Sequence, residues 1–265
     1  MDRRIINGRR MLCRDVGQGG RAVLMLHGAI GDERDWDLQI AALVDAGHRA
    51  IFPLRAGCGE SDPYPDGVST AREASDMLAL LDQLGIDDAV LVGHSQGATV
   101  AREIYLRAPQ RVAAIVSVDG FVLGKLDCKE LGPSDVDART RALFKRHGAA
   151  LHDLGRPWDY PSSFNVERVR RQQSVPAERR RLRRIVDDPD DCHVPAGLFC
   201  EVPLLVFVTT RGHFEVDDAR IDELRSRIPA TSFRLVPVVH SGHWIHFEQA
   251  ELVNRELARF VDELG

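Results

Sequence analysis

A serine between two glycines is the most reactive-looking feature of this 265-residue sequence. The sequence reads GHSQG at 93–97, after an apolar run and before a helical pattern that stops at Pro109. Two such glycines relieve crowding in a tight strand-to-helix turn, which exposes the hydroxyl above a sheet, and the helix N-terminus favours the negative charge of acyl transfer. The GxSxG pattern also occurs often by chance, and the alternative interpretation is a turn with only a structural role. In this context we predict that Ser95 is a nucleophile.

A serine hydroxyl needs a neighbouring base, and histidine is the side chain best tuned to take its proton. Three histidines compete near the C-terminus: His240, His243 and His246. His243 stands in a loop beside a glycine, from which it can project over the sheet edge. We predict His243 as the base, His246 as a packing or capping residue, and His240 as structural.

A second glycine-containing segment, HGAI at 27–30, follows the first predicted central strand. A loop in that place can direct a backbone N–H group towards the serine, and the residue after the serine supplies another. We therefore predict that Ala29 and Gln96 donate the two N–H groups of an oxyanion hole. Taken alone, HGAI is equally well explained as an ordinary turn.

Short apolar runs and amphipathic patterns alternate along the chain. Runs of this kind, typical of strands buried on both faces, occur at 22–26, 49–52, 89–92, 112–118, 204–208 and 232–236. Helical spacing of apolar residues occurs at 74–84, 100–108 and 253–264. The alternation predicts an α/β fold with a doubly wound, mostly parallel sheet, and Asn7-Gly8 predicts a hairpin at one edge.

One region breaks the alternation. Residues 121–201 contain no convincing central strand, several prolines and many arginines. We predict a helical cap at 121–201 over a core formed by 1–120 and 202–265. The arginines would suit an anionic substrate or an acidic partner, but nearby carboxylates favour a solvated helical face.

The segments HGAI, GHSQG and SGHWIHFEQ, in that order, resemble the α/β-hydrolase superfamily, particularly its cap-bearing serine esterases, lactonases and C–C hydrolases. Trp36 and the stretch RAGCGESD at 55–62 also resemble landmarks of that family. The resemblance covers the chain apart from the cap. It implies the α/β-hydrolase fold, a serine–acid–histidine triad, hydrolytic chemistry and no cofactor or metal.

The acid of that triad is missing from its usual place. In most of the family it follows the penultimate strand, where this sequence has Gly212. Asp119 ends the run at 112–118, a position that carries the acid in certain dehalogenases, lactonases and cofactor-free dioxygenases of the superfamily. We favour Asp119; the alternatives are Glu215 or Asp217, or no functional acid.

Composition bounds the class of protein. A net charge of −5 argues against general nucleic-acid binding. We find no signal peptide, no membrane span and no paired cysteine motif among five dispersed cysteines, which favours a cytoplasmic protein. The expected partner is a small-molecule substrate, and the sequence is compatible with a homo-oligomer. Aromatic side chains that could line an apolar pocket, although such residues more often belong to a core, are Phe121, Trp158, Tyr160, Phe164 and Trp244.

The leading hypothesis is a hydrolase that cleaves an ester or lactone through an acyl-Ser95 intermediate, with C–C bond hydrolysis as a variant. Epoxide hydrolases and haloalkane dehalogenases need an aspartate nucleophile, whereas position 95 is serine. Two other classes stay open: a cofactor-free dioxygenase, compatible with an acid at Asp119, and a non-catalytic small-molecule receptor, since fold alone does not certify activity.

Overall fold

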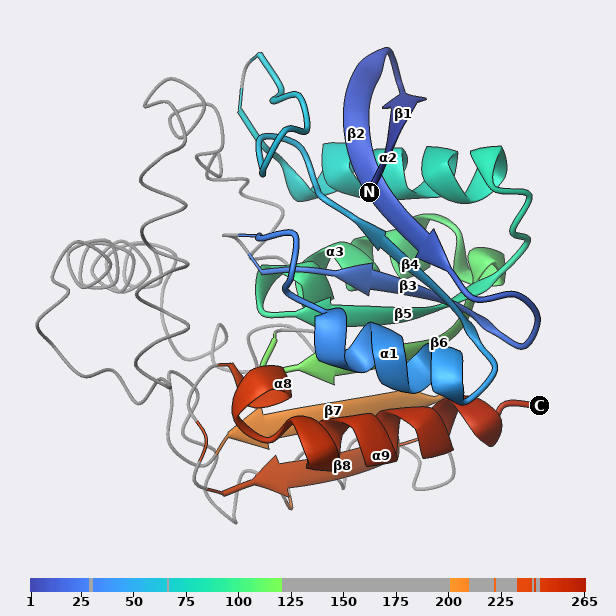
Figure 1. Ribbon diagram of the computed structural model, residues 1–265, viewed down its shortest axis with the longest axis vertical. Coiled ribbons are helices and arrows are strands. Elements are labelled where there is room, and N and C mark those ends of the chain that lie inside the picture. The colour runs from blue at the N-terminus through green and yellow to red at the C-terminus, as the bar shows by residue number, and fades with distance from the viewer. Residues whose placement is uncertain are drawn as a thin grey trace, which may run out of the picture.

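The computed structural model describes residues 1–28, 31–65, 67–120, 201–209, 222, 233–239, 241 and 244–265. The strands in this part of the chain form one eight-stranded sheet in the order β1-β2-β4-β3-β5-β6-β7-β8 (Figure 1). Their bounds are β1 Asp2–Ile6, β2 Arg9–Val16, β3 Ala22–Leu26, β4 Arg49–Pro53, β5 Ala89–His94, β6 Val112–Val118, β7 Leu204–Thr209 and β8 Phe233–Val238. All six predicted central strands are confirmed within two residues.

Parallel pairing joins the six strands from β4 to β8, and only the pairs β1–β2 and β2–β4 are antiparallel. The predicted hairpin is confirmed at the edge of the sheet. Its two turn residues, Asn7 and Gly8, have φ angles of 49° and 76°, as the tight two-residue turn between twisted strands requires.

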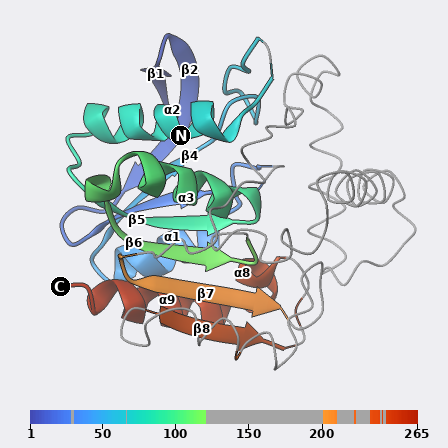
Figure 2. The ribbon, with the colours of Figure 1, turned by 180° about the vertical axis from the view of Figure 1, so that it is seen from behind.

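Helices cover both faces of the sheet. Those of the described residues are α1 Asp37–Asp45, α2 Thr70–Gln83, α3 Gln96–Arg107, the short 3-10 helix η1 Pro109–Arg111, α8 Ile245–Glu248 and α9 Ala250–Asp262. Helices α1 and α9 lie on the near face in Figure 1, and α2 and α3 lie on the near face in Figure 2. Within the described ranges, no helix is long and apolar enough to cross a membrane.

The alternation of side chains along each strand divides the core into two layers. Leu24 and Leu91 pack with α2 and α3, whereas Val23 and Val90 pack with α1 and α9. Successive side chains of a strand point to opposite faces, so strands that are covered on both sides must be apolar throughout. This requirement explains the continuous apolar runs and confirms the predicted doubly wound α/β fold. The predicted cap at 121–201 lies outside the described residues, apart from Glu201.

Candidate active site

Ser95 occupies the turn between β5 and α3 in a backbone conformation that side chains rarely adopt. Its φ and ψ angles are 53° and −121°, and such strain persists only where the surrounding structure fixes it. Two hydrogen bonds do so here: Ser95 N–H donates to the Val118 carbonyl, and Ala98 N–H donates to the Ser95 carbonyl, each at 3.0 Å. The residue is half-buried. Ser95 therefore lies at the carboxyl edge of the sheet, in the strand-to-helix turn where the sequence predicts a nucleophile.

The two glycines that flank the turn are required by close backbone approaches. A Cβ atom at Gly93 would lie 2.4 Å from the Ala98 nitrogen, and one at Gly97 would lie 2.2 Å from the Leu26 carbonyl oxygen. Neither backbone atom can move without shifting β3 or the first turn of α3. The glycines therefore allow α3 to start directly against the sheet, as the sequence analysis predicted.

Asp119 lies immediately beside this turn, at the end of the neighbouring strand β6. It is 2% exposed, its φ angle is 46°, and its N–H donates to the Phe207 carbonyl at 3.0 Å. A Cβ atom at the next residue, Gly120, would lie 2.6 Å from the Ser95 carbonyl oxygen. The structure thus brings Asp119 and Ser95 to adjacent strand ends, both with left-handed backbone.

The segment after β3 forms the opposite side of the same turn. A Cβ atom at Gly28 would lie 3.5 Å from the Ser95 Cβ atom. His27 is fully buried, and its Nε2 accepts a hydrogen bond of 2.9 Å from the Arg55 N–H group. The first half of the predicted oxyanion segment therefore lies beside the Ser95 turn, and His27 anchors it to the loop after β4.

A buried ion pair lies next to this segment. The guanidinium group of Arg55 donates to Glu73 at 2.6 Å and to the Gly28 carbonyl at 2.7 Å, and it also contacts the His27 carbonyl. The Gln96 side-chain amide completes the network, with its oxygen 3.3 Å from Arg55 and its nitrogen 3.4 Å from Glu73. Arg55 and Glu73 are 0% and 1% exposed. The stretch that contains Arg55 is one of the family landmarks in the sequence, but no sequence pattern predicts a role for Arg55 or Glu73.

The loop that carries Arg55 is fixed at its far end by a second polar cluster. Asp76 on α2 accepts hydrogen bonds from Arg9, from the Asn7 amide and from the Tyr64 hydroxyl. The Arg9 guanidinium lies 3.8 Å from the centre of the Tyr64 ring. Burial and the nearby Asp76 carboxylate raise the pKa of Tyr64. The phenol therefore stays neutral and keeps donating to Asp76.

Aromatic and imidazole rings pack behind the Ser95 turn. The His94 ring lies 4.8 Å from Trp244 and 4.6 Å from His246, and His246 in turn lies 4.5 Å from Trp36. His246 is fully buried in this stack, in agreement with its prediction as a packing residue. Trp244 is half-buried, with its ring beside that of His94, the residue that precedes Ser95. Its role in a substrate pocket stays a prediction.

Several predicted site residues lie outside the described residues. They are Ala29, His243, Phe121, Trp158, Tyr160 and the alternative acids Glu215 and Asp217, together with His240, Phe164 and Gly212. Their assignments stay predictions. Among the described residues, no group of three or more His, Cys, Asp or Glu side chains could hold a metal ion.

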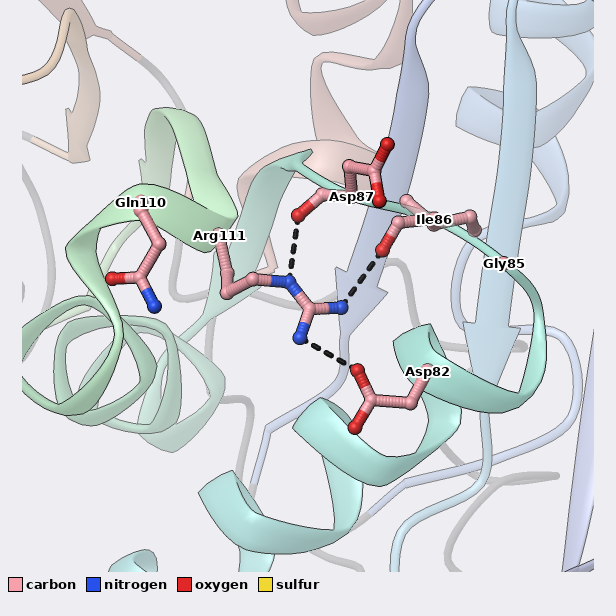
Figure 3. Close-up of a pocket in the computed structure, with 6 residues that line it drawn as sticks. All are labelled: Asp82, Gly85, Ile86, Asp87, Gln110 and Arg111. Carbon is pink, nitrogen blue, oxygen red and sulfur yellow. Dashed lines mark hydrogen bonds and ion pairs between the residues drawn. The ribbon is translucent and has the colours of Figure 1, made fainter.

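The opposite, amino edge of the sheet carries a pocket of a different kind (Figure 3). There Arg111 donates to the Asp87 and Ile86 carbonyls at 2.6 and 2.8 Å and to the Asp82 carboxylate at 2.6 Å. These bonds join the segments that lead into β5 and β6 to the end of α2. They hold the fold together far from Ser95, and the pocket contains no candidate nucleophile.

The fold and the turn around Ser95 define the class of this protein. The chain belongs to the alpha/beta hydrolase family, whose sequence profile matches residues 23–256. The predicted family and fold are therefore confirmed.

A curated relative and two solved structures with the same fold carry the names of different enzymes. Epoxide hydrolase 2 of Siraitia grosvenorii is 40% identical over 114 residues, which are 42% of this chain but only 36% of that protein. A thermophilic esterase from Thermogutta terrifontis matches 100% of this chain and 99% of its own, with a TM-score of 0.78 and 23% identity. An N-acyl homoserine lactone degrading enzyme matches 98% of this chain and 100% of its own, with a TM-score of 0.75 and 21% identity.

Proposed function

We propose that this chain is a serine hydrolase that cleaves an ester or lactone bond of a small organic molecule through an acyl-Ser95 intermediate. The observation that carries the proposal is the strained Ser95 turn, held between β3 and β6 at the carboxyl edge of the sheet. Membership of the alpha/beta hydrolase family supports hydrolysis as the reaction class. The fold shared with an esterase and a lactone-degrading enzyme is compatible with either bond.

In the proposed reaction His243 takes the Ser95 proton as the Oγ atom bonds to the carbonyl carbon and the carbonyl electron pair moves onto oxygen. The N–H groups of Ala29 and Gln96 hold this oxyanion. Its collapse re-forms the carbonyl and breaks the bond to the leaving oxygen, which takes the proton from His243. Water then attacks the acyl group with His243 as base, and Ser95 leaves with its proton restored.

Asp119 is the proposed acid of the triad. A carboxylate fixes the tautomer of the catalytic histidine and stabilises the imidazolium that forms. Asp119 is buried at the strand end next to Ser95, where a carboxylate can perform this task. Glu215 and Asp217 remain the competing acids.

Serine at position 95 argues against epoxide opening, although several relatives are named epoxide hydrolases. A carboxylate that attacks an epoxide carbon forms an ester, which water can hydrolyse. A serine oxygen would form an ether, which would leave the enzyme blocked. An acyl group on serine is instead an ester, so Ser95 suits carbonyl substrates.

The test is turnover of p-nitrophenyl esters of graded chain length and of small lactones. Ser95→Ala and His243→Ala should each lower kcat/KM by about three orders of magnitude or more. The matched control is Ser69→Ala, which removes only the side-chain cap of α2 and should keep turnover. Turnover that survives in Ser95→Ala would contradict the proposal. Oxygen uptake and ligand binding would then test the dioxygenase and receptor alternatives.

A further inference from the structure

The buried pair Arg55–Glu73 contacts both segments that supply the proposed oxyanion donors. Arg55 binds the carbonyl groups of His27 and Gly28 on one side and the Gln96 side chain on the other. Glu73 binds Arg55 and the same Gln96 amide. These segments come from the ends of β3 and β5, so one ion pair connects two separate parts of the chain that must act on one oxygen atom.

The carbonyl contact has a direct consequence for the donor. In a trans peptide the C=O and N–H groups point in opposite directions and rotate together. The peptide that carries the Gly28 carbonyl also carries the next N–H group, the one proposed to bind the oxyanion. A guanidinium that holds the Gly28 carbonyl therefore acts on the peptide group whose N–H is the proposed donor.

The Gln96 contact acts on the second donor. The side-chain amide bridges Arg55 and Glu73 at 3.3 and 3.4 Å, and its own backbone N–H is the proposed donor after Ser95. Because Gln96 opens α3, anchoring its side chain also limits fraying of the first helical turn.

Stability does not explain why these charges are buried. An ion pair that loses all its water gains little over apolar residues of the same volume, because the cost of dehydration offsets the attraction. Here the arginine and the glutamate are 0% and 1% exposed. The directional hydrogen bonds that the pair makes to carbonyl and amide groups are what apolar residues could not supply.

We propose that Arg55 and Glu73 are positioning residues, which hold the Gly28 carbonyl and the Gln96 side chain so that the proposed oxyanion donors of these two segments stabilise the transition state. This inference rests on the proposed function. It predicts that substitutions of these residues weaken stabilisation of the transition state. Binding of the substrate in the ground state and the pKa of the catalytic base should not change.

The experiment uses Arg55→Lys and Glu73→Gln in the whole 265-residue chain, with kcat expressed per active site titrated by a fluorophosphonate. Lysine keeps the charge but cannot contact the carboxylate and both carbonyls together. We expect kcat per titrated site to fall about 10- to 100-fold, less than the loss of a donor itself, while KM changes less than about threefold. The pH profile of kcat/KM should keep its midpoint. The affinity of a trifluoromethyl ketone, which mimics the tetrahedral state, should fall in parallel with kcat/KM.

Two further variants keep the test decisive if the buried substitutions impair folding. Gln96→Leu cuts one link outside the ion pair and should lower kcat a few-fold by the same criteria. Arg111→Lys makes the equivalent change at the amino edge and should leave kcat per site unchanged.

Three results would overturn the inference. The first is that Arg55→Lys, Glu73→Gln and Gln96→Leu all keep the wild-type kcat per titrated site and differ only in a smaller fraction of active protein. The network would then have only a structural role. Another is an equal loss in Arg111→Lys. Failure of the wild-type enzyme to react with the fluorophosphonate or to turn over esters would overturn the proposed function itself, and the inference with it.

Discussion

Arg55 and Arg111 bind the same kinds of group at opposite edges of the sheet. Each binds two consecutive backbone carbonyls and one carboxylate of helix α2, Glu73 near its start and Asp82 near its end. Their exposure differs: the Arg55–Glu73 pair is 0% and 1% exposed, whereas Arg111 and Asp82 are 20% and 66% exposed. The two edges of the sheet therefore place similar bonds in very different dielectric surroundings.

The difference in exposure indicates different roles for the two arginines: Arg111 stabilises the fold, whereas Arg55 is proposed to position groups of the site. At the amino edge water solvates the charges, so the Arg111 bonds cost little and each contributes little. At the carboxyl edge the charges are dehydrated, and the left-handed residues Ser95 and Asp119 lie on adjacent strand ends. Strain and buried charge together are typical of sites where geometry is maintained at the expense of stability.

The largest expected difference between the edges is in activity. Asp119→Asn keeps the shape of the side chain but removes the proposed acid, and kcat should fall on the order of 1,000- to 10,000-fold. The same change at the amino edge, Asp82→Asn, should leave kcat unchanged. Steady-state kinetics on one ester substrate compare the two. A loss below about tenfold in Asp119→Asn, together with a large loss in Asp217→Asn, would assign the acid to Asp217 instead.

The next largest difference is in stability. Arg55→Met leaves Glu73 buried without its guanidinium partner and should lower the free energy of unfolding by about 3–5 kcal/mol. Arg111→Met, at the solvated edge, should lower it by about 1 kcal/mol. Urea denaturation followed by circular dichroism measures both.

A double variant separates the two roles of the buried pair. Arg55→Met combined with Glu73→Leu should regain most of the lost stability, because no charge remains buried, yet its kcat should stay low. Recovery of kcat along with stability would show that the pair only fills space.

Glycine substitutions give a smaller contrast. In Gly97→Ala the new Cβ atom would lie 2.2 Å from the Leu26 carbonyl oxygen, so α3 must shift, at about 1–3 kcal/mol. Displacement of the neighbouring Gln96 should lower kcat/KM about 100-fold. Gly85→Ala has open space but a φ angle of 65°, so it should cost about 1 kcal/mol with wild-type kcat. Similar kcat/KM values for Gly97→Ala and Gly85→Ala would contradict the claim that activity depends on the close packing of the Ser95 turn.

The smallest effect is a pH dependence of stability at the amino edge. Hydrogen bonding to Arg49 lowers the pKa of Asp15, which joins β2 to β4. Because the folded pKa lies below the unfolded one, the contribution is present above about pH 4 and is lost as pH falls further. Solvent screening keeps it below about 1 kcal/mol. Urea midpoints from pH 6 to 2.5 should fall less steeply for Asp15→Asn, and identical slopes would refute the prediction.

The elements that the sequence predicted best are those with the simplest burial. Strands such as 112–118 are covered on both faces, so their apolar runs mark them almost to the residue. Helix α1 was not predicted, because one of its buried positions is polar: Gln39 bonds to His246 and Asn254, more than 200 residues away. Local sequence patterns cannot predict a hydrogen-bond partner that is so distant in the chain.

The same limit applies to the site. The turn at GHSQG and the strand end at Asp119 could be predicted because strand, turn and glycine signals coincide within a few residues. The bonds from Arg55 to Glu73 and to Gln96 span 18 and 41 positions, and only the closed sheet brings these residues together. Their signal in the sequence was an arginine after a strand and a glutamate in the first turn of a helix, neither of which is distinctive.

Whether Ser95 is an activated nucleophile is measured by treating the purified protein with a fluorophosphonate and locating the adduct by mass spectrometry. The proposed mechanism predicts one phosphonylated residue, Ser95, with labelling that is lost in His243→Ala and slowed in Asp119→Asn. A folded wild-type protein that stays unlabelled, or that is labelled elsewhere, would contradict an activated serine at the turn between β5 and α3.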